Sequence, residues 1–427
     1  MRTTTGVRMP HLATHQGAGG LTITASVLPT VPMVQAHLAV PLRLRDRSDL
    51  AACDVLTACW PDLPACARFE QRGGIVHVRR NRQWMYFSLV CAADQLPLLA
   101  HTLAAAVHAE YPEDLVRPAA AKAAQQAGLA VAQPAVEATR RLWEAVYGHL
   151  PPLADPVPDP GEVLTVSARQ VTAAHAQSVD PGPSHLVVVG DLDVDRLFAR
   201  LDAALGSWHG PADPAPQLPS LRPLSDRSVH RHARPGWQQT LIRLAAPSSS
   251  RQDIDALPAA LAAALILGGN FSSKVMTVLR EQLGLAYRAT AQITGIWDSD
   301  MLVIEADVAP ATVDQAMSQL GKLLEEFATT GPTERELAAA VGYSHGAYNL
   351  ALGSQSSRAS CLLSYLTNGQ PLSRISEIPA RTAELTCRDV RQAAALFHPR
   401  NMSGVICEGT APSTDDEAGS VPSITPR

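Results

Sequence analysis

A long-range internal repeat is the feature that most limits how this chain of 427 residues can fold. Residues Ser167–Asp191 and Thr386–Thr410 each begin with Ser or Thr, run through an Ala-rich stretch, and end in apolar residues followed by Gly. Ser or Thr before such a stretch is typical of a helix N-cap, and the apolar run closed by Gly is typical of a strand. The repeat predicts two homologous domains, because its period is far too long for a solenoid.

The same offset aligns two helical stretches, residues 113–148 and 334–369. Thr312 with Gln315, and Thr333 with Glu336, predict capping boxes at the starts of two helices. Periodicity in the second half predicts strands at 239–245, 287–293 and 301–308 and helices at 253–267 and 313–327. We therefore expect an α+β fold of two homologous domains, each a mainly antiparallel sheet covered on one side by helices.

Composition shifts suggest where the domains begin and end. A Pro-rich stretch with little apolar periodicity is typical of a linker, and a polar, acidic end is typical of a disordered tail. The predicted organisation is a flexible N-terminus (1–20), a first domain (21–210), a linker (211–236), a second, homologous domain (237–410) and a tail (411–427).

Charge and hydropathy exclude several function classes. The formal net charge is −5 and no basic stripe stands out, so nucleic acid is not an expected partner. Arg supplies nearly all of the 35 basic residues, and with abundant Ala and Pro this favours a bacterial source rich in G and C. The longest apolar runs are too short or too interrupted to cross a bilayer, and the N-terminus lacks a signal-peptide pattern. We expect a cytoplasmic protein with no membrane partner.

The most specific segment is LGGNFSSKVMTVLREQLGLAYRA, at Leu267–Ala289. It resembles the signature of the C-terminal domains of the insulinase/pitrilysin/mitochondrial-processing-peptidase family of metallopeptidases. FEQRGG at 69–74, VYGHLPP at 146–152 and LVVVGDLD at 186–193 resemble further landmarks in family order. The resemblance covers residues 20 to 410 and implies a metallohydrolase-like fold of the processing-peptidase type.

Active members of that family carry a zinc motif, H-x-x-E-H, on a helix of the first domain. The corresponding stretch here, Ser48–Asp62, contains neither His nor Glu, so no metal site is expected in this chain. His11 and His15 have a spacing that could suit a metal on a helix, but no carboxylate accompanies them in the local sequence. Three cysteines could form a soft-metal cluster, although buried helix residues are the favoured interpretation: Cys53, Cys59 and Cys66.

The resemblance implies that Arg280 and Tyr287 hydrogen-bond the carbonyl oxygen of the scissile peptide at another domain's zinc site. A guanidinium and a phenol are donors that suit a growing oxyanion. A structural alternative makes Arg280 a cation near a helix C-terminus and Tyr287 a strand-starting aromatic. The resemblance also suggests a loop beside the substrate cleft, although a helix stop and a cap explain the same residues: Gly268, Gly269, Phe271 and Ser272.

These features together predict a zinc-less companion subunit of a heterodimeric bacterial metallopeptidase, inactive alone. The expected partners are a homologous zinc-bearing subunit, which would hold the zinc, and a peptide substrate. Trimming the leader of a ribosomally made natural product is one role known from bacterial relatives of this type. A structural core-type subunit and a peptide-binding protein without proteolytic role are the alternatives.

Overall fold

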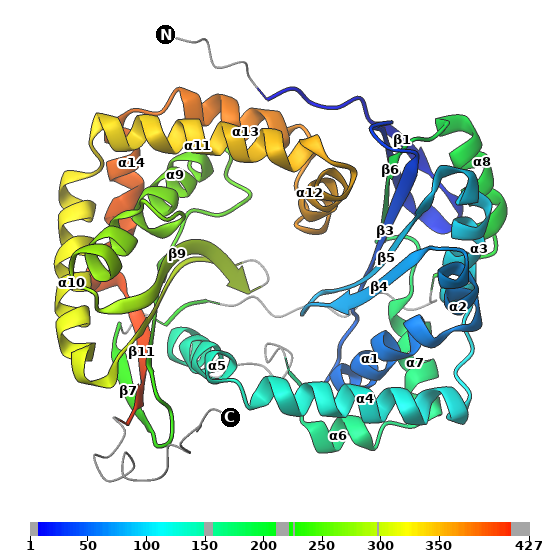
Figure 1. The fold of residues 1–427 in the computed structure, drawn as a ribbon, viewed down its shortest axis with the longest axis horizontal. Coiled ribbons are helices and arrows are strands. Elements are labelled where there is room, and N and C mark those ends of the chain that lie inside the picture. The colour runs from blue at the N-terminus through cyan, green and yellow to red at the C-terminus, as the bar shows by residue number, and fades with distance from the viewer. Residues whose placement is uncertain (1–6, 149–156, 211–221, 225–226, 297–298, 411–427) are drawn as a thin grey trace, which may run out of the picture. The chain divides into compact units, whose positions relative to one another are not determined.

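The computed structural model describes residues 7–148, 157–210, 222–224, 227–296 and 299–410 (Figure 1). Contacts group these residues into two units, each drawn from several stretches of the chain. Unit 1 takes the described residues of Met1–Ala132, Leu150–Ser220 and Val341–Glu384. Unit 2 takes those of Gln133–His149, Leu221–Ala340 and Leu385–Arg427.

Unit 1 contains a six-stranded sheet in the order β1-β2-β6-β3-β5-β4. The β2–β6 pair is parallel and the other pairs are antiparallel. The central strands β6 and β3 are rich in buried Val, Leu and Ala. The strand bounds are β1 Ala13–Gln16, β2 Thr22–Val27, β3 Met33–Pro41, β4 Ile75–Arg80, β5 Trp84–Ala92 and β6 His185–Gly190.

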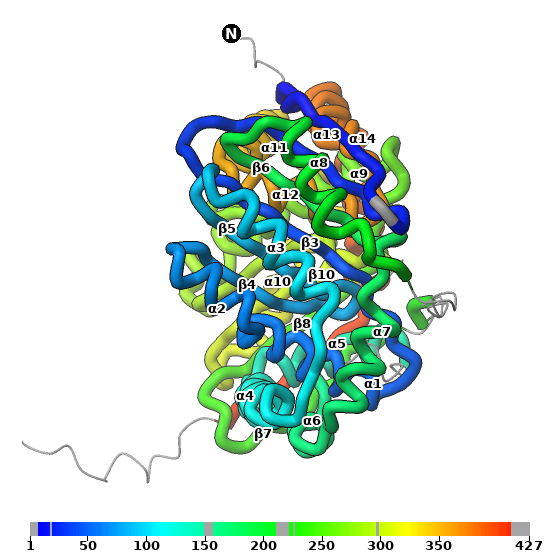
Figure 2. The backbone as a smooth tube through the Cα atoms, turned by 90° about the vertical axis from the view of Figure 1, so that its right-hand side faces the viewer, coloured from blue at the N-terminus to red at the C-terminus, as the bar shows by residue number. Residues whose placement is uncertain are grey.

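Helices cover this sheet on one face, and a single helix packs on the other. Figure 2 faces the helix-covered side of unit 1, where α3 and α8 lie side by side. On the opposite face Leu362 and Leu363 of α12 pack with Ala39 and Val187 of the sheet. The bounds are α1 Arg47–Cys59, α2 Pro64–Gln71, α3 Leu96–Val107, α4 Glu113–Val131, α6 Pro160–Leu164, α7 Ala168–Ser178, α8 Val194–Leu205, α12 Gln355–Thr367 and α13 Arg374–Ala383.

Unit 2 repeats this plan with a five-stranded sheet in the order β7-β11-β8-β10-β9. The β7–β11 pair is parallel and the others are antiparallel. The strand bounds are β7 Val229–Arg234, β8 Thr240–Pro247, β9 Ala286–Ile296, β10 Ser299–Val308 and β11 Ser403–Gly409. The helix bounds are α5 Pro134–Tyr147, α9 Leu257–Gly268, α10 Val313–Thr330 and α14 Cys387–Ala394, with α11 (Glu334–Gly353) beginning in unit 2 and ending in unit 1.

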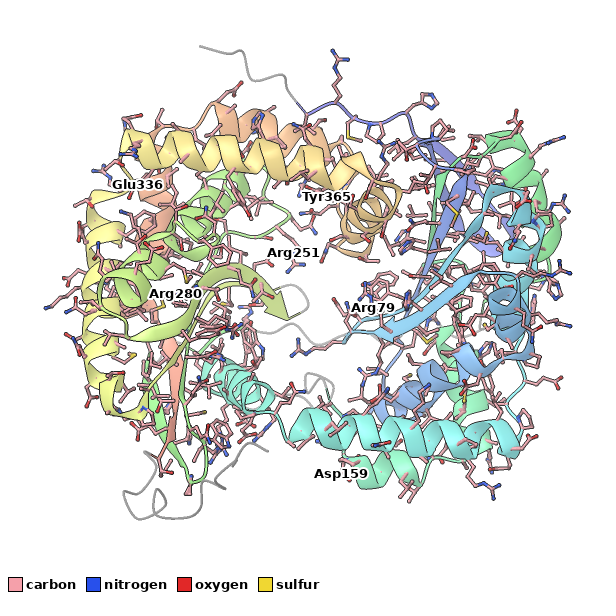
Figure 3. The ribbon with its side chains drawn as sticks, in the orientation of Figure 1. Arg79, Asp159, Arg251, Arg280, Glu336 and Tyr365 are labelled. Atoms are coloured by element: carbon pink, nitrogen blue, oxygen red, sulfur yellow. The ribbon has the colours of Figure 1, made fainter. Side chains whose placement is uncertain are left out.

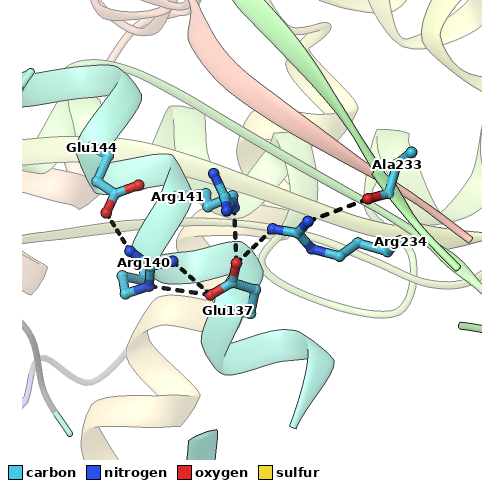
Figure 4. A network of polar contacts seen from close by, with 6 residues as sticks. All are labelled: Glu137, Arg140, Arg141, Glu144, Ala233 and Arg234. Carbon is cyan, nitrogen blue, oxygen red and sulfur yellow. Dashed lines mark hydrogen bonds and ion pairs between the residues drawn. The ribbon is translucent and has the colours of Figure 1, made fainter. Parts of the chain in front are cut away.

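Helix α5 packs against β11 and β8 on the face opposite α10 (Figure 1). An ion pair between Glu137 of α5 and Arg234 of β7 joins the two elements (Figure 4). Glu137 accepts hydrogen bonds from Arg234 of β7 at 2.6 Å and from Arg140 and Arg141 of its own helix at 2.8 Å each. Burial alone would raise the pKa of Glu137, but these three guanidinium groups outweigh it and hold the pKa at about 2. The carboxylate is therefore charged at neutral pH.

The repeat in the sequence corresponds to a repeat in the structure, except that each half of the chain contributes one helix to the unit of the other half. Helix pairs α4–α5 and α11–α12 occupy the two aligned helical stretches. Capping boxes at Ser167 and Thr386 begin α7 and α14, and each helix is followed by the closing strand, β6 or β11. Whereas the expected domains 21–210 and 237–410 are continuous in sequence, α5 from the first half belongs to unit 2 and α12 from the second half belongs to unit 1.

Two stretches expected to lack regular structure contain strands. Residues 229–234, placed in the linker by their polar composition, form β7 in parallel register with β11. Residues 13–16, placed in the flexible N-terminus, pair with β2 as β1. Both are edge strands with exposed or half-exposed faces, which explains why neither shows apolar alternation. The expected tail 411–427 lies outside the described residues.

The helix starts of the second half include one error of prediction. Thr333 and Glu336 form the expected capping box, with each backbone N–H bonded to the other's side chain at 2.8 and 3.3 Å. Thr312 does not cap α10, because a short 3-10 turn at Pro310–Thr312 precedes the helix and the Thr312 hydroxyl donates instead to the Ala309 carbonyl at 3.1 Å. The prediction of a capping box at Thr312 and Gln315 was therefore wrong.

Candidate functional site

The most specific sequence segment folds as a helix end, a loop, a short helix and the start of an edge strand, all within unit 2. Helix α9 ends at Gly268, the loop runs through Ser273, and residues 276–282 form a π-helix. Gly284 then adopts φ 62°, a left-handed conformation that glycine tolerates best, and turns the chain into β9. π-Helices are rare and frequently occur at functional sites.

Tyr287 sits on an irregularity of β9. Arg288 pairs with Asp307 of β10, but the next pair joins Ala286 to Val308, so Tyr287 has no partner across the ladder. Such a bulge redirects the side chain of the extra residue. The Tyr287 side chain is 78% exposed.

Arg280, on the π-helix, is labelled in Figure 3 and lies close to Tyr287. Its guanidinium carbon lies 5.8 Å from the centroid of the Tyr287 ring, within range of a cation–π contact. Both side chains are exposed, and neither makes a hydrogen bond or ion pair with another residue that the structure describes. The structure thus brings the two predicted residues together with their donor groups available.

The four weaker candidates have mixed explanations. A Cβ at Gly268 would lie 2.2 Å from the backbone nitrogen of Ala291, so close packing of α9 on β9 already requires glycine there. A Cβ at Gly269 would lie 2.8 Å from Cα of Leu265. Phe271 is 77% exposed, and Ser272, also exposed, donates its backbone N–H to the Asn270 side chain at 3.0 Å. Phe271 and Ser272 therefore lie on the surface loop that precedes the helix carrying Arg280.

The sequence analysis did not predict a network of charged side chains on β8, β9 and β10, next to the bulge at Tyr287. Arg288 contacts Glu305 at 2.8 Å and Asp307 at 3.1 Å, and the fully buried Arg243 of β8 contacts Asp307 at 2.8 Å and Glu305 at 3.4 Å. All four side chains lie on one face of neighbouring strands. The available signal was the acidic alternation in MLVIEADV, which the periodicity argument used only to locate the strand.

Helix α1, where the resemblance would place a zinc motif, contains neither His nor Glu. A cavity of about 400 Å³ lies between α1, α4 and the end of β4. Asp54 is the one acidic residue among those lining it, and its carboxylate is bound by Arg80. The other charged residues that line the cavity are cationic, Arg79, Arg80 and Lys122, and their charge disfavours a bound metal ion.

The other metal-binding alternatives do not match the geometry either. Cys53, Cys59 and Cys66 are buried, and burial raises the pKa of each thiol to about 12, which keeps them protonated. His15 lies in β1, where the helical spacing to His11 does not apply, and its Nε2 contacts Asp202 at 2.7 Å. Across the described ranges, no group of three or more His, Cys, Asp or Glu side chains is placed to hold a metal ion.

The fold is a duplicated α+β chain, and H-x-x-E-H does not occur in its sequence. Residues 165–342 match the family described as Peptidase M16 inactive domain, which confirms the resemblance seen in the sequence. An uncharacterized zinc protease from Streptomyces coelicolor is 29% identical over 244 residues, covering 54% of this chain and 51% of that protein. A non-peptidase homolog, YmxG, from Helicobacter pylori is 27% identical over 194 residues, covering 44% of this chain and 43% of that protein.

Solved structures agree on the fold. A crystal structure of a peptidase M16 inactive domain from Pseudomonas fluorescens superposes with a TM-score of 0.80 at 21% identity, over 94% of this chain and 99% of that one. The chain spans about half the length of the curated relatives it matches. The matched residues 165–342 resemble a domain that the family description calls inactive. Within the described residues no helix is both long and apolar enough to cross a membrane.

Proposed function

We propose that this chain is the zinc-less subunit of a heterodimeric M16-type metallopeptidase in the bacterial cytoplasm. In this proposal Arg280 and Tyr287 bind the scissile carbonyl of a peptide cleaved at a partner's zinc site. The partner would be a homologous chain bearing H-x-x-E-H, and the substrate a peptide such as the leader of a ribosomally made product. The loop carrying Gly268, Gly269, Phe271 and Ser272 would lie beside the bound peptide.

One observation carries this proposal: Tyr287 occupies a strand bulge beside Arg280, and both donor groups are exposed and unengaged. A chain that served only as a scaffold would gain more from pairing such an arginine with a carboxylate, as Arg288 is paired nearby. Holding two donors toward solvent on adjacent, well-anchored elements is the arrangement that oxyanion stabilisation requires.

The chemistry of this chain's residues follows from what peptide hydrolysis demands. When water attacks the scissile carbonyl carbon, the carbonyl oxygen gains negative charge as the tetrahedral intermediate forms. The guanidinium of Arg280 and the hydroxyl of Tyr287 donate hydrogen bonds to that oxygen, and these bonds strengthen as its charge grows. Loss of one such donor typically lowers kcat by about 100- to 1,000-fold.

The test is a mixing experiment with a homologous chain that carries H-x-x-E-H. The two purified chains are assayed alone and together on an unstructured fluorogenic peptide. We expect cleavage only in the mixture, reduced by about 100-fold or more with Arg280→Ala or Tyr287→Phe. Arg335→Ala and Tyr343→Phe, at exposed positions on α11, are the matched controls and should leave the rate unchanged.

Two results would exclude this role. Absence of cleavage in the mixture would favour a structural core-type chain or a peptide-binding protein. Full activity after Arg280→Ala and Tyr287→Phe combined would show that the pair does not reach the substrate. Elemental analysis of the isolated chain provides an independent check, since we expect no stoichiometric zinc, and one tightly held zinc per chain would contradict the reading of α1.

A further inference from the structure

One face of the unit 1 sheet is only partly covered by α12. Cross-strand register places Arg79 of β4 opposite Tyr86 of β5, and places His37 of β3 opposite Ser88 of β5. These two rows are neighbours on the same face, because Tyr86 and Ser88 are two residues apart on one strand. Helix α12 packs on this face against β6 and β3, so the part over β5 and β4 stays open.

A cavity of about 200 Å³ lies where the open part of the face meets the C-terminal half of α12. Its lining is mainly polar, and none of the lining residues is acidic. The residues that matter for recognition are His37, Arg79, Asn81 and Tyr86 from the sheet side and Ser364 and Asn368 from the helix side. The cavity therefore presents a fixed positive charge surrounded by neutral hydrogen-bonding groups.

The side chain of Arg79 is held in place by an aromatic ring, but no described carboxylate balances its charge. Its guanidinium carbon lies 4.0 Å from the centroid of the Tyr86 ring, a stacked arrangement that limits the rotamers of the side chain. Within the described part of the chain it makes no ion pair or hydrogen bond, whereas its neighbour Arg80 is bound to Asp54. The planar fork of Arg79 donors is thus held at the end of β4 without an acceptor (Figure 3).

The remaining groups around the cavity are compatible with an anion. The Nδ1 atom of His37 lies 3.1 Å from the Ser88 hydroxyl, while its Nε2 atom has no hydrogen-bond partner among the residues that the structure describes. Burial, with Arg79 and His77 nearby, lowers the pKa of His37 to about 4, so the ring is neutral at pH 7. At the end of α12 the carbonyls of Leu363 and Ser364 already accept hydrogen bonds from the Thr367 and Asn368 side chains at 2.9 and 2.8 Å, which lessens the negative end of the helix.

We propose that this cavity binds a carboxylate group, held in a bidentate manner by Arg79 with further hydrogen bonds from Asn81 and Ser364. A carboxylate suits the site better than a phosphate, because one unpaired guanidinium balances a single negative charge and planar forks match carboxylates. The carboxylate can come from an acidic side chain of a peptide or from a free small acid. The site stands apart from the proposed cleavage reaction, since binding requires no partner subunit.

The test uses the full chain labelled with 5-fluorotryptophan, because Trp84 also lines the cavity and its fluorine signal can be assigned with Trp84→Phe. N-acetylglutamate amide, N-acetylglutamine amide and propionate are titrated in parallel. We expect the glutamate derivative to shift the Trp84 signal saturably and the glutamine derivative to leave it unchanged. Arg79→Gln should weaken binding by at least 10-fold, and Arg72→Gln, an exposed arginine at the end of α2, should not.

The propionate titration separates the two sources of the carboxylate. Binding of propionate as tight as that of the glutamate derivative indicates a free acid, and markedly weaker binding indicates an acidic residue within a peptide. The proposal is overturned if the glutamate and glutamine derivatives bind alike, if Arg79→Gln binds as the native chain does, or if no probe shifts the Trp84 signal at tens of millimolar.

Discussion

Arg288 and Asp307 face each other across β9 and β10, with Nε and Oδ2 3.1 Å apart, at the last regular pair before the bulge. Tyr287, the extra residue of the bulge, lies directly after this contact in the ladder. The Arg288–Asp307 ion pair therefore fixes β9 against β10 directly beside the bulge. The bulge turns the side chain of Tyr287 away from this charged network and toward solvent.

Within that network the buried member should dominate stability. Arg243 is fully buried between Glu305 and Asp307, whereas the Arg288 side chain is 44% exposed. We expect Arg243→Ala to lower the free energy of unfolding by about 3 kcal/mol, because it leaves two carboxylates under-compensated and opens a cavity. Arg288→Gln should cost less than about 1 kcal/mol. Urea denaturation measures both, and equal effects would refute this division of roles.

The two predicted capping boxes provide a matched pair of threonines. Thr333 caps α11 through its hydroxyl, while Thr312 donates to the Ala309 carbonyl and caps nothing. Thr333→Ala should therefore lower the free energy of unfolding by about 1 kcal/mol, and Thr312→Ala by only a few tenths. Thermal unfolding of the two variants compares them directly; a Thr312→Ala loss as large as that of Thr333→Ala would mean that the local geometry at α10 is misassigned.

Predictions from the sequence were correct where the signal was a local pattern of residues and failed where the structure depends on contacts between distant parts of the chain. Apolar periodicity located β8, β9, β10 and α10 to within a few residues, because those elements carry many buried apolar residues. The same reasoning could not find β7, whose polar residues are held by pairing with β11, more than 150 residues away. Nor could it find that α5 and α12 pack in the other half's unit, since no local pattern records which sheet an amphipathic helix will cover.

The candidate site shows the same division. The segment from Gly268 to Tyr287 drew attention to Arg280 and Tyr287, and their proximity depends on the left-handed turn at Gly284, which a glycine in sequence can only suggest. The bulge at Tyr287 is set by register against β10, a non-local property. Arg79 and His37 escaped notice because they come from different strands, and only cross-strand pairing places them in adjacent rows on one face.

Alanine substitutions at two glycines test whether Gly268 is required for close packing. A Cβ at Gly268 would meet the Ala291 backbone at 2.2 Å, whereas a Cβ at Gly342, within α11, meets nothing within 4 Å. We expect Gly268→Ala to destabilise the chain by about 2 kcal/mol through this clash. Gly342→Ala should stabilise it by about 0.5 to 1 kcal/mol through helix propensity. Opposite signs in thermal unfolding would support the packing role of Gly268, and a neutral Gly268→Ala would contradict it.

A buried histidine in unit 1 should make stability fall on mild acidification. Trp60 Nε1 donates to the Tyr111 hydroxyl at 2.9 Å, Tyr111 donates to His175 Nδ1 at 2.7 Å, and His175 Nε2 donates to the Val107 carbonyl at 3.0 Å. This chain requires a neutral ring, because a protonated Nδ1 could not accept from Tyr111. Burial lowers the pKa of His175 to about 4, against the small opposing effect of the Val107 carbonyl.

The sign of the effect follows from linkage. Between pH 6.5 and about 4 the unfolded chain takes up a proton at His175 and the folded chain does not, so stability is complete above this range and is lost as the pH falls through it. The loss should reach about 1 to 3 kcal/mol for this residue. His175→Gln, which can donate and accept but does not titrate, should flatten the dependence of the urea midpoint on pH between 7 and 4.5.

Other groups with shifted pKa values also contribute to this dependence. The pKa of His37 is similarly lowered, so His37 adds a residual slope. Glu137, whose pKa is lowered to about 2, adds a slope of the same sign at the acid end of this range, where the unfolded chain begins to take up its proton. An undiminished slope in His175→Gln would show that the ring does not remain neutral in the folded chain.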